Sequence, residues 1–191
     1  MSTSNPPIVL RVPDAPPSEG GYNPPPISWL LGTWHVTHSS LPMWKSKRNV
    51  RITYTALPPS SPSVPQDNTD RLDDLVEYQP LEGSKVSTVH GVDKAAAEGR
   101  DAWTWRGKGW LMVASSAWQV LGWGTDGEGN DWAVTYFAKT LFTPAGVDFY
   151  SRSGKGLSAI TVQGIENALA KTESEEVSRL AKEVFAVKMD G

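Results

Sequence analysis

Three histidines, His35, His38 and His90, are the side chains of this sequence best suited to proton transfer near neutral pH. Alternation along 33–39 places His38 on the same face as Trp34, and places His35 on the opposite face. His90 also falls on the predicted inner face of its strand. Because burial shifts an imidazole pKa readily, His38 and His90 could act as acid and base in an apolar cup, or could simply be hydrogen-bonded barrel residues.

Aromatic residues on the same predicted faces would line such a cup. Tyr54, Tyr78 and Tyr136 fall at inward positions, and together with His38 they supply the few polar groups that orient a ligand in an apolar pocket. The remaining wall is predicted to consist of Trp34, Val36, Ile52, Val76, His90, Trp105, Trp118 and Trp132. The alternative is that these aromatic rings fill the interior and leave no cavity.

Other chemical motifs are incomplete. Gly154-Lys155-Gly156 lacks the spacing of a phosphate-binding loop and follows a predicted antiparallel strand, so we expect a turn there. A metal held by His38 and His90 would need a third ligand such as Glu77 or Asp74, and no short-spaced zinc motif occurs. We therefore expect no metal and no cofactor.

These residues would be positioned by about eight short strands with alternating apolar and polar residues. The fold class is therefore mainly β, and short connections favour an antiparallel up-and-down barrel, whose interior at eight strands just holds side chains or one small ligand. The predicted strands are 33–39, 49–57, 72–78, 85–92, 102–106, 110–121, 131–141 and 147–153. A long loop at 58–70 is rich in Pro, Ser and Asn, which predicts a lid or disorder.

Both ends of the chain differ from this pattern. Residues 1–26 contain eight prolines, which predicts an extended arm. The barrel is assigned to 27–156, beginning with a helical turn at 27–31. From residue 157 the apolar residues recur with helical spacing, and Thr172-Glu173-Ser174-Glu175 has the form of a capping box. We expect the helical segment 157–191 to pack on the outside of the barrel.

Composition limits the class of protein. The formal net charge of −3 and the lack of a large basic cluster argue against nucleic-acid binding. Cysteine is absent, which fits a reducing compartment. The first ten residues lack the features of a secretory signal, and no apolar run is long enough to insert into a membrane. We expect a cytoplasmic protein, with its oligomeric state (monomer or homodimer) left open.

Three residues carry a resemblance to a known family. The segment Leu31-Gly32-Thr33-Trp34 before the first strand resembles the Gly-x-Trp signature of lipocalin-like, or calycin, barrels. Arg152 in the last strand is similar to the arginine that these barrels stack over that tryptophan. The resemblance covers about residues 27–170 and implies structural roles for Gly32, Trp34 and Arg152. It also implies a small apolar ligand in the cup and, in some intracellular members, enzymatic activity.

Three hypotheses about function follow. The first is an intracellular barrel that binds a small hydrophobic molecule of aromatic, polyketide-like or terpenoid-like type. The second is a cofactor-independent cyclase, isomerase or lyase, possibly of secondary metabolism, with His38 as general acid or base and Tyr54 and Tyr78 orienting the substrate. The third is a protein-interaction module that uses the proline-rich arm and the last helix.

Overall fold

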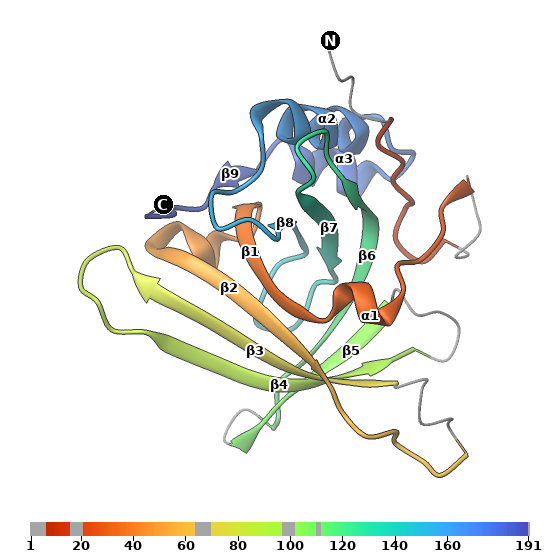
Figure 1. Cartoon of the computed structure of the whole chain (residues 1–191), viewed down its shortest axis with the longest axis vertical. Coiled ribbons are helices and arrows are strands. Elements are labelled where there is room, and N and C mark those ends of the chain that lie inside the picture. Colours follow the sequence, from red (N-terminus) through yellow and green to blue (C-terminus); the bar gives the residue numbers. More distant parts are fainter. Residues whose placement is uncertain (1–6, 16–20, 64–69, 97–101, 110–111, 191) are drawn as a thin grey trace.

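A computed structural model describes residues 7–15, 21–63, 70–96, 102–109 and 112–190, and its main feature is a closed β-barrel (Figure 1). Short helical segments precede and interrupt the first strands: α1 (Ile27–Leu30) and η2 (Pro42–Ser46). The barrel strands are β1 (Gly32–Ser39), β2 (Lys47–Ala56), β3 (Arg71–Pro80), β4 (Ser87–Ala95), β5 (Ala102–Gly107), β6 (Ser115–Thr125), β7 (Asp131–Phe137) and β8 (Gly146–Ser151). Two helices and a short strand follow: α2 (Ala159–Ala170), α3 (Glu175–Ala181) and β9 (Phe185–Ala186).

The eight barrel strands pair in an up-and-down order. Each strand is antiparallel to the next along the chain, and β1 pairs with both β8 and β2, which closes the sheet. Pairing between β1 and β2 stops at His35 and Arg51. Beyond that point β9 pairs with the end of β1, and Lys188 bridges to Arg48. The C-terminal segment thus fills the gap where the first two strands separate.

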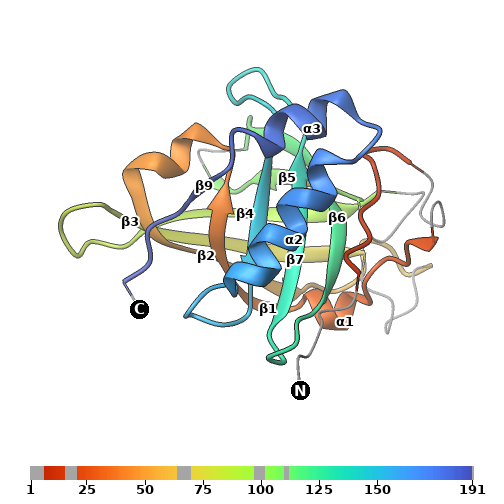
Figure 2. The same cartoon turned by 90° about the horizontal axis from the view of Figure 1, so that it is seen from above.

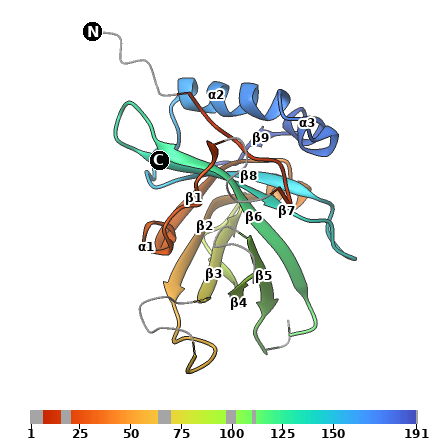
Figure 3. The ribbon, with the colours of Figure 1, turned by 90° about the vertical axis from the view of Figure 1, so that its right-hand side faces the viewer.

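The barrel is apolar on its inner side and on part of its outer side. An outer cluster joins residues of β6, β7 and β8 to Ile165 and Leu169 of α2 and to Val177 and Leu180 of α3. The two helices therefore cover one wall of the barrel, and β3–β5 form the opposite wall (Figures 2 and 3). Among the described residues, no helix is both long enough and apolar enough to cross a lipid bilayer.

The segment before α1 packs along the barrel. The Arg11 guanidinium donates to the Val120 carbonyl oxygen and to Gln119 Oε1, at 3.0 and 2.9 Å. The Tyr22 hydroxyl also donates to the Val120 carbonyl oxygen, at 3.1 Å. These contacts hold the described part of the proline-rich segment against β6. Residues 1–6 and 16–20 of that segment lie outside the described residues.

The predicted fold class is confirmed: the chain forms an eight-stranded antiparallel up-and-down barrel with C-terminal helices. Strand ends differ from the predicted ranges by a few residues, as expected from periodicity alone. The largest shift is in the sixth strand, which is predicted at 110–121 and observed at Ser115–Thr125. Residues 110–111 of that predicted strand and 64–69 of the predicted long loop lie outside the described residues.

Three irregularities change which side chains point into the barrel. The register between β1 and β8 shifts between Val36 and His38, so that Thr37 is an extra residue. A similar shift occurs in β6 between Val120 and Gly122, and another occurs in β2 near Asn49, which has a φ of 52°. Beyond each bulge the inward and outward positions exchange.

Candidate functional site: an aromatic cup with buried carboxyl groups

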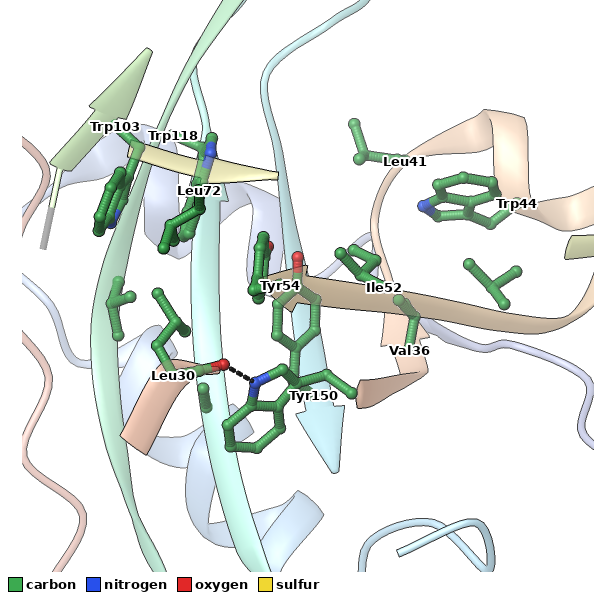
Figure 4. Packing of buried hydrophobic residues seen from close by; sticks show 14 of the residues in the cluster. Leu30, Val36, Leu41, Trp44, Ile52, Tyr54, Leu72, Trp103, Trp118 and Tyr150 are labelled. Atoms are coloured by element: carbon green, nitrogen blue, oxygen red, sulfur yellow. Dashed lines mark hydrogen bonds between the residues drawn. The ribbon is translucent and has the colours of Figure 1, made fainter. Parts of the chain in front are cut away.

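One end of the barrel is closed by Trp34. Its ring is completely buried, and its Nε1 donates to the Leu30 carbonyl oxygen at 2.8 Å. Figure 4 draws this hydrogen bond as the dashed line that starts at Leu30. The Arg152 guanidinium carbon lies 3.6 Å from the ring centroid, and its nitrogens donate to the carbonyl oxygens of Thr33 and Leu31, at 3.0 and 2.7 Å. Gly32 has a φ of 95°, and a Cβ there would lie 3.2 Å from Arg152 Nη1. The stack is the one that the resemblance implies.

The barrel interior is packed in the half next to Trp34 and hollow in the half nearer the open end. Leu30, Leu72, Trp103 and Tyr150 belong to the inner cluster above Trp34, and none of them lines a cavity of about 330 Å³ nearer the other end. Figure 4 shows Leu30 at one end of this cluster, and Leu41 and Trp44 at the other. The two predicted alternatives, a filled interior and a ligand cup, therefore apply to different halves of one barrel.

Most of the cavity wall is aromatic or aliphatic. Tyr54 stacks on Trp118 with ring centroids 5.5 Å apart, and Trp118 stacks on Trp103 at 5.9 Å. Five residues predicted from the sequence line the cavity together: Ile52, Tyr54, Val76, Trp105 and Trp118. Three other predicted residues belong to the interior without lining the cavity. Trp34 and Val36 are buried in the inner cluster, and Tyr78 packs edge-on against Trp44 at 5.8 Å.

Three carboxyl groups are buried inside this aromatic barrel. Asp74 and Asp148 line the cavity, whereas Asp93 is fully buried and does not line it. Trp118 Nε1 donates to Asp93 Oδ1 at 2.8 Å, and the Ser39 hydroxyl donates to Asp148 Oδ1 at 2.5 Å. No N–H or hydroxyl of the described chain donates to Asp74 Oδ1, Asp93 Oδ2 or Asp148 Oδ2.

Burial disfavours the ionised form of these groups. It raises the pKa of Asp148 to about 7, against the opposing effects of the Ser39 hydroxyl and the Trp44 indole N–H. Burial likewise raises the pKa of Asp93 to about 7, against the opposing effects of the Trp118 indole N–H and of the neighbouring Asp74. The pKa of Asp74 is raised by burial and by the neighbouring Asp93. The pKa values of Tyr54 and Tyr150 are also raised by burial, so both phenols stay neutral.

His38 does not point into the cup, and this predicted placement is wrong. The bulge at Thr37 turns the ring to the outer face, where it lies 5.6 Å from Phe149, a member of the outer cluster. Its Nδ1 is 3.1 Å from Thr37 Oγ1, and the Glu166 carboxylate of α2 acts on it electrostatically. Burial nevertheless lowers the pKa of His38. Ser39 takes the inward position instead, beside Asp148.

His90 also faces outward, contrary to prediction. Its Nε2 lies 2.8 Å from Asp73 Oδ2, and Lys108 contacts the other oxygen of the same carboxylate. The side chains of all three residues are partly exposed. Alternation in β4 has the opposite phase from the predicted one, because Val89 and Asp93 point inward. No group of three or more His, Asp or Glu in the described ranges is arranged to hold a metal ion.

Trp132 and Tyr136 lie on the outer wall rather than in the cup. Both belong to the cluster beneath the helices, and the Tyr136 hydroxyl donates to Glu176 of α3 at 2.7 Å. Trp132 lies over Gly124 and lines a separate surface hollow of about 290 Å³ beside Tyr22. Alternation assigns the wrong face in β7 because apolar residues occupy both faces of that strand.

The open end of the barrel carries an apolar rim. Seven of the nine large apolar side chains exposed in the described residues lie on the four loops at this end, and we call them the rim: Met43, Leu81, Val86, Met112, Val113, Leu141 and Phe142. Trp44 of η2 reaches the cavity from the same end. Scattered exposed apolar residues are ordinary, but seven at one opening are typical of a surface that meets an apolar molecule.

Sequence reasoning missed the carboxyl groups. Asp74 alternates in phase with the inward residues Leu72 and Val76, so its orientation was available from the pattern. The sequence pattern suggests a role for it only as a possible third ligand of a metal. Asp148 stands in a strand buried on both faces, where periodicity indicates neither face.

Comparisons with solved structures agree with this architecture. Lobster apocrustacyanin A1 superposes with a TM-score of 0.57 at 12% identity, covering 84% of this chain and 78% of that protein. The siderocalin Ex-FABP gives a TM-score of 0.51 at 14% identity, covering 85% and 95%. The amine binding protein of Rhodnius prolixus, solved as its tryptamine complex, gives 0.51 at 11% identity, covering 82% and 77%. No protein-family model matches the chain.

The closed eight-stranded barrel and its Trp34–Arg152 closure give the chain a lipocalin-like (calycin) fold. In sequence, the chain is 31% identical over 165 residues to Botcinic acid biosynthesis cluster B protein 12 of Botryotinia fuckeliana (strain B05.10). The match covers 83% of this chain and 72% of the relative. The chain belongs to the family of that protein.

Proposed function

We propose that this protein binds a small, mostly apolar molecule of secondary metabolism in the cavity near the open end of its barrel. The observation that carries the proposal is the cavity of about 330 Å³ lined by Tyr54, Trp105 and Trp118. Its volume is at the lower end of the range of small-molecule sites, about 300–1,000 Å³. An aromatic, polyketide-like or terpenoid-like molecule has flat or curved apolar faces that suit such walls.

Two further observations support this proposal. The rim gives an apolar ligand a favourable surface beside the opening. The relative from Botryotinia fuckeliana is named for a botcinic acid biosynthesis cluster, and structural neighbours include a siderocalin with dual ligand specificities. Both are consistent with a small-molecule role in a biosynthetic pathway.

Binding of the neutral fluorescent probe N-phenyl-1-naphthylamine tests the proposal. Val89 lines the cavity, whereas its neighbour Thr88 is exposed on the outer face of the same strand. Val89→Trp should fill the cavity and weaken probe binding at least about tenfold, a loss of about 1.4 kcal/mol. Thr88→Trp adds the same indole outside and should leave the affinity within about twofold. Fluorescence titration of the probe into both variants measures the difference.

The proposal is overturned if the wild-type protein gives no saturable fluorescence increase. It is also overturned if both tryptophan variants bind the probe as the wild type does, because the probe would then sit on the surface.

A second candidate function is cofactor-independent catalysis of a cyclisation, isomerisation or elimination. The observation that favours it is that Asp74 and Asp148 line one cavity and both have raised pKa values. A protonated carboxyl group can serve as a general acid and an ionised one as a general base, each contributing about 10²–10⁴-fold. Tyr54 would orient the substrate beside them. The outward position of His38 removes it from this role.

Metabolite analysis separates the two candidates. The gene is replaced by one encoding Asp148→Asn in the organism that carries it, and extracts are compared by mass spectrometry. An enzyme would accumulate an isomeric or hydrated precursor and lose product, whereas a carrier would leave the set of products unchanged.

A further inference from the structure

The cavity wall holds carboxyl groups without cationic partners. Asp74 on β3 pairs across the sheet with Gly91, and Asp93 on β4 pairs with Leu72, so the two carboxyl groups are diagonal neighbours on the inner face. They are close enough for Asp93 to raise the pKa of Asp74. Asp148 reaches the same cavity from β8. An unpaired carboxylate in such surroundings is strongly disfavoured, so these groups hold protons or acquire a partner.

The other titratable groups that face these carboxyls are known for each wall. β2 contributes Tyr54, β8 contributes Tyr150, and β3 contributes Asp73 from its outer face. From β1, β6 and η2 the neighbours are Ser39, Trp118 and Trp44, which do not titrate in this range. No Lys, Arg or His side chain of the described segments lines the cavity. The protein itself therefore supplies no positive charge to hold these groups ionised.

We propose that Asp74 and Asp148 are the polar contacts for the ligand, acting as neutral carboxylic acids that select uncharged molecules bearing a ketone, lactone or hydroxyl oxygen. A carboxylic acid offers one O–H donor and one carbonyl acceptor, which matches such oxygens. In Asp148, Oδ1 already accepts from Ser39, which leaves the buried Oδ2 for this contact. This inference rests on the proposed function and adds the chemical class of the ligand.

A trio of probes with one carbon skeleton tests the selectivity. 2-Acetylnaphthalene carries a ketone, 2-isopropylnaphthalene has a methyl group in place of its oxygen, and 1-(2-naphthyl)ethylamine has an ammonium group there. Each is used to displace N-phenyl-1-naphthylamine at pH 6. The ketone should bind about tenfold more tightly than the hydrocarbon, and more tightly than the amine, because only the ketone accepts from a neutral acid without burying a charge.

Substitutions locate the contact. Asp148→Leu and Asp74→Leu should reduce the preference for the ketone over the hydrocarbon to less than about threefold. Asp148→Asn should retain it, since an amide also donates. Asp73→Leu is the matched control. Asp73 is the neighbour of Asp74 in sequence, but its side chain lies on the outer face of the barrel. This substitution should leave the preference for the ketone over the hydrocarbon unchanged.

An infrared measurement keeps the inference testable if the leucine variants fail to fold. The wild type at pH 6 should show the carbonyl band of a protonated carboxylic acid. The band should weaken in Asp148→Asn and shift when 2-acetylnaphthalene binds.

Two results would overturn the inference while leaving the proposed function intact. One is equal binding of ketone and hydrocarbon by a protein that still binds N-phenyl-1-naphthylamine. The other is a preference for the amine that grows from pH 6 to pH 8, which would indicate carboxylates awaiting a cation. Failure of N-phenyl-1-naphthylamine itself to bind would instead remove the proposed function.

Discussion

Replacing Trp34 with alanine should lower the free energy of unfolding by about 3–5 kcal/mol, the usual range for a buried tryptophan. The ring is completely buried at the closed end of the barrel. Its loss leaves the Leu30 carbonyl oxygen without its donor and leaves Arg152 above an empty space. The surrounding strands are tied by barrel closure and can collapse only partly into that space. Urea denaturation followed by circular dichroism measures the change.

Two further variants test whether the loss is specific to the closed end of the barrel. Trp34→Phe retains one ring but loses the N–H donor and part of the buried ring volume, so it should cost about 1–3 kcal/mol, less than Trp34→Ala. Trp105→Ala removes an indole from the cavity wall, where one side of the ring already faces open space, and should be milder than Trp34→Ala. If the free energy of unfolding of Trp34→Ala lies within 1 kcal/mol of the wild-type value, Trp34 does not close the barrel as described.

The parts of the fold that sequence reasoning identifies are those with one polar face. In β2, Val50, Ile52 and Tyr54 alternate with Arg51 and Thr53, and their orientation is as predicted. One side of this strand faces water and the other faces the core, so a period of two is visible. The Gly32-x-Trp34 motif was likewise identifiable, because positive φ and a buried indole restrict the residue types allowed.

Orientation is lost where both faces of a strand are buried. α2 and α3 cover β7 and β8 from outside, so Val134 and Tyr136 are as apolar as the inner residues between which they alternate. The pattern then contains no information about which face is the interior. Trp132 and Tyr136 were assigned to the cup for this reason.

One extra residue in β1, Thr37, explains why His38 does not lie where alternation predicts it. Alternation predicts His38 inside, but Thr37 is accommodated as a bulge and reverses the phase for the residues after it. Bulges depend on contacts across the sheet, here between β1 and β8, which are more than 100 positions apart in sequence. Local periodicity cannot anticipate them.

The buried carboxyl groups also predict an unusual dependence of stability on pH. The folded-state pKa values of Asp93 and Asp148 are raised to about 7, from about 3.8 in the unfolded chain. A raised carboxyl pKa means that the folded state holds the proton more tightly, so this stabilisation is fully present below about pH 4 and is lost as pH rises through 7. Each pKa unit corresponds to about 1.4 kcal/mol, which sets an upper bound near 4 kcal/mol per group.

Carboxylates on the barrel surface change the stability in the opposite direction. They lower the free energy of unfolding when the pH falls below about 4. The Arg51 guanidinium lowers the pKa of Glu77, and Lys108 and His90 lower that of Asp73 against the effect of partial burial. Their stabilisation is present above their unfolded pKa values near 4 and is lost as pH falls further. The stability maximum should therefore lie near pH 4 to 5, and the decline from there should be largely complete above about pH 7.

Urea denaturation at pH 5, 7 and 8.5 should show this decline as a loss of about 2–4 kcal/mol in the wild type. Asp148→Asn keeps the shape of the side chain and cannot ionise, so its stability should vary less over the same range and exceed that of the wild type at pH 8.5. Asp73→Asn, on the outer face of β3, should preserve the wild-type slope. A wild-type protein whose stability rises steadily from pH 5 to pH 8.5 would show that the interior carboxyl groups ionise freely. The cup would then contain water or a counterion beside Asp148 rather than a neutral acid.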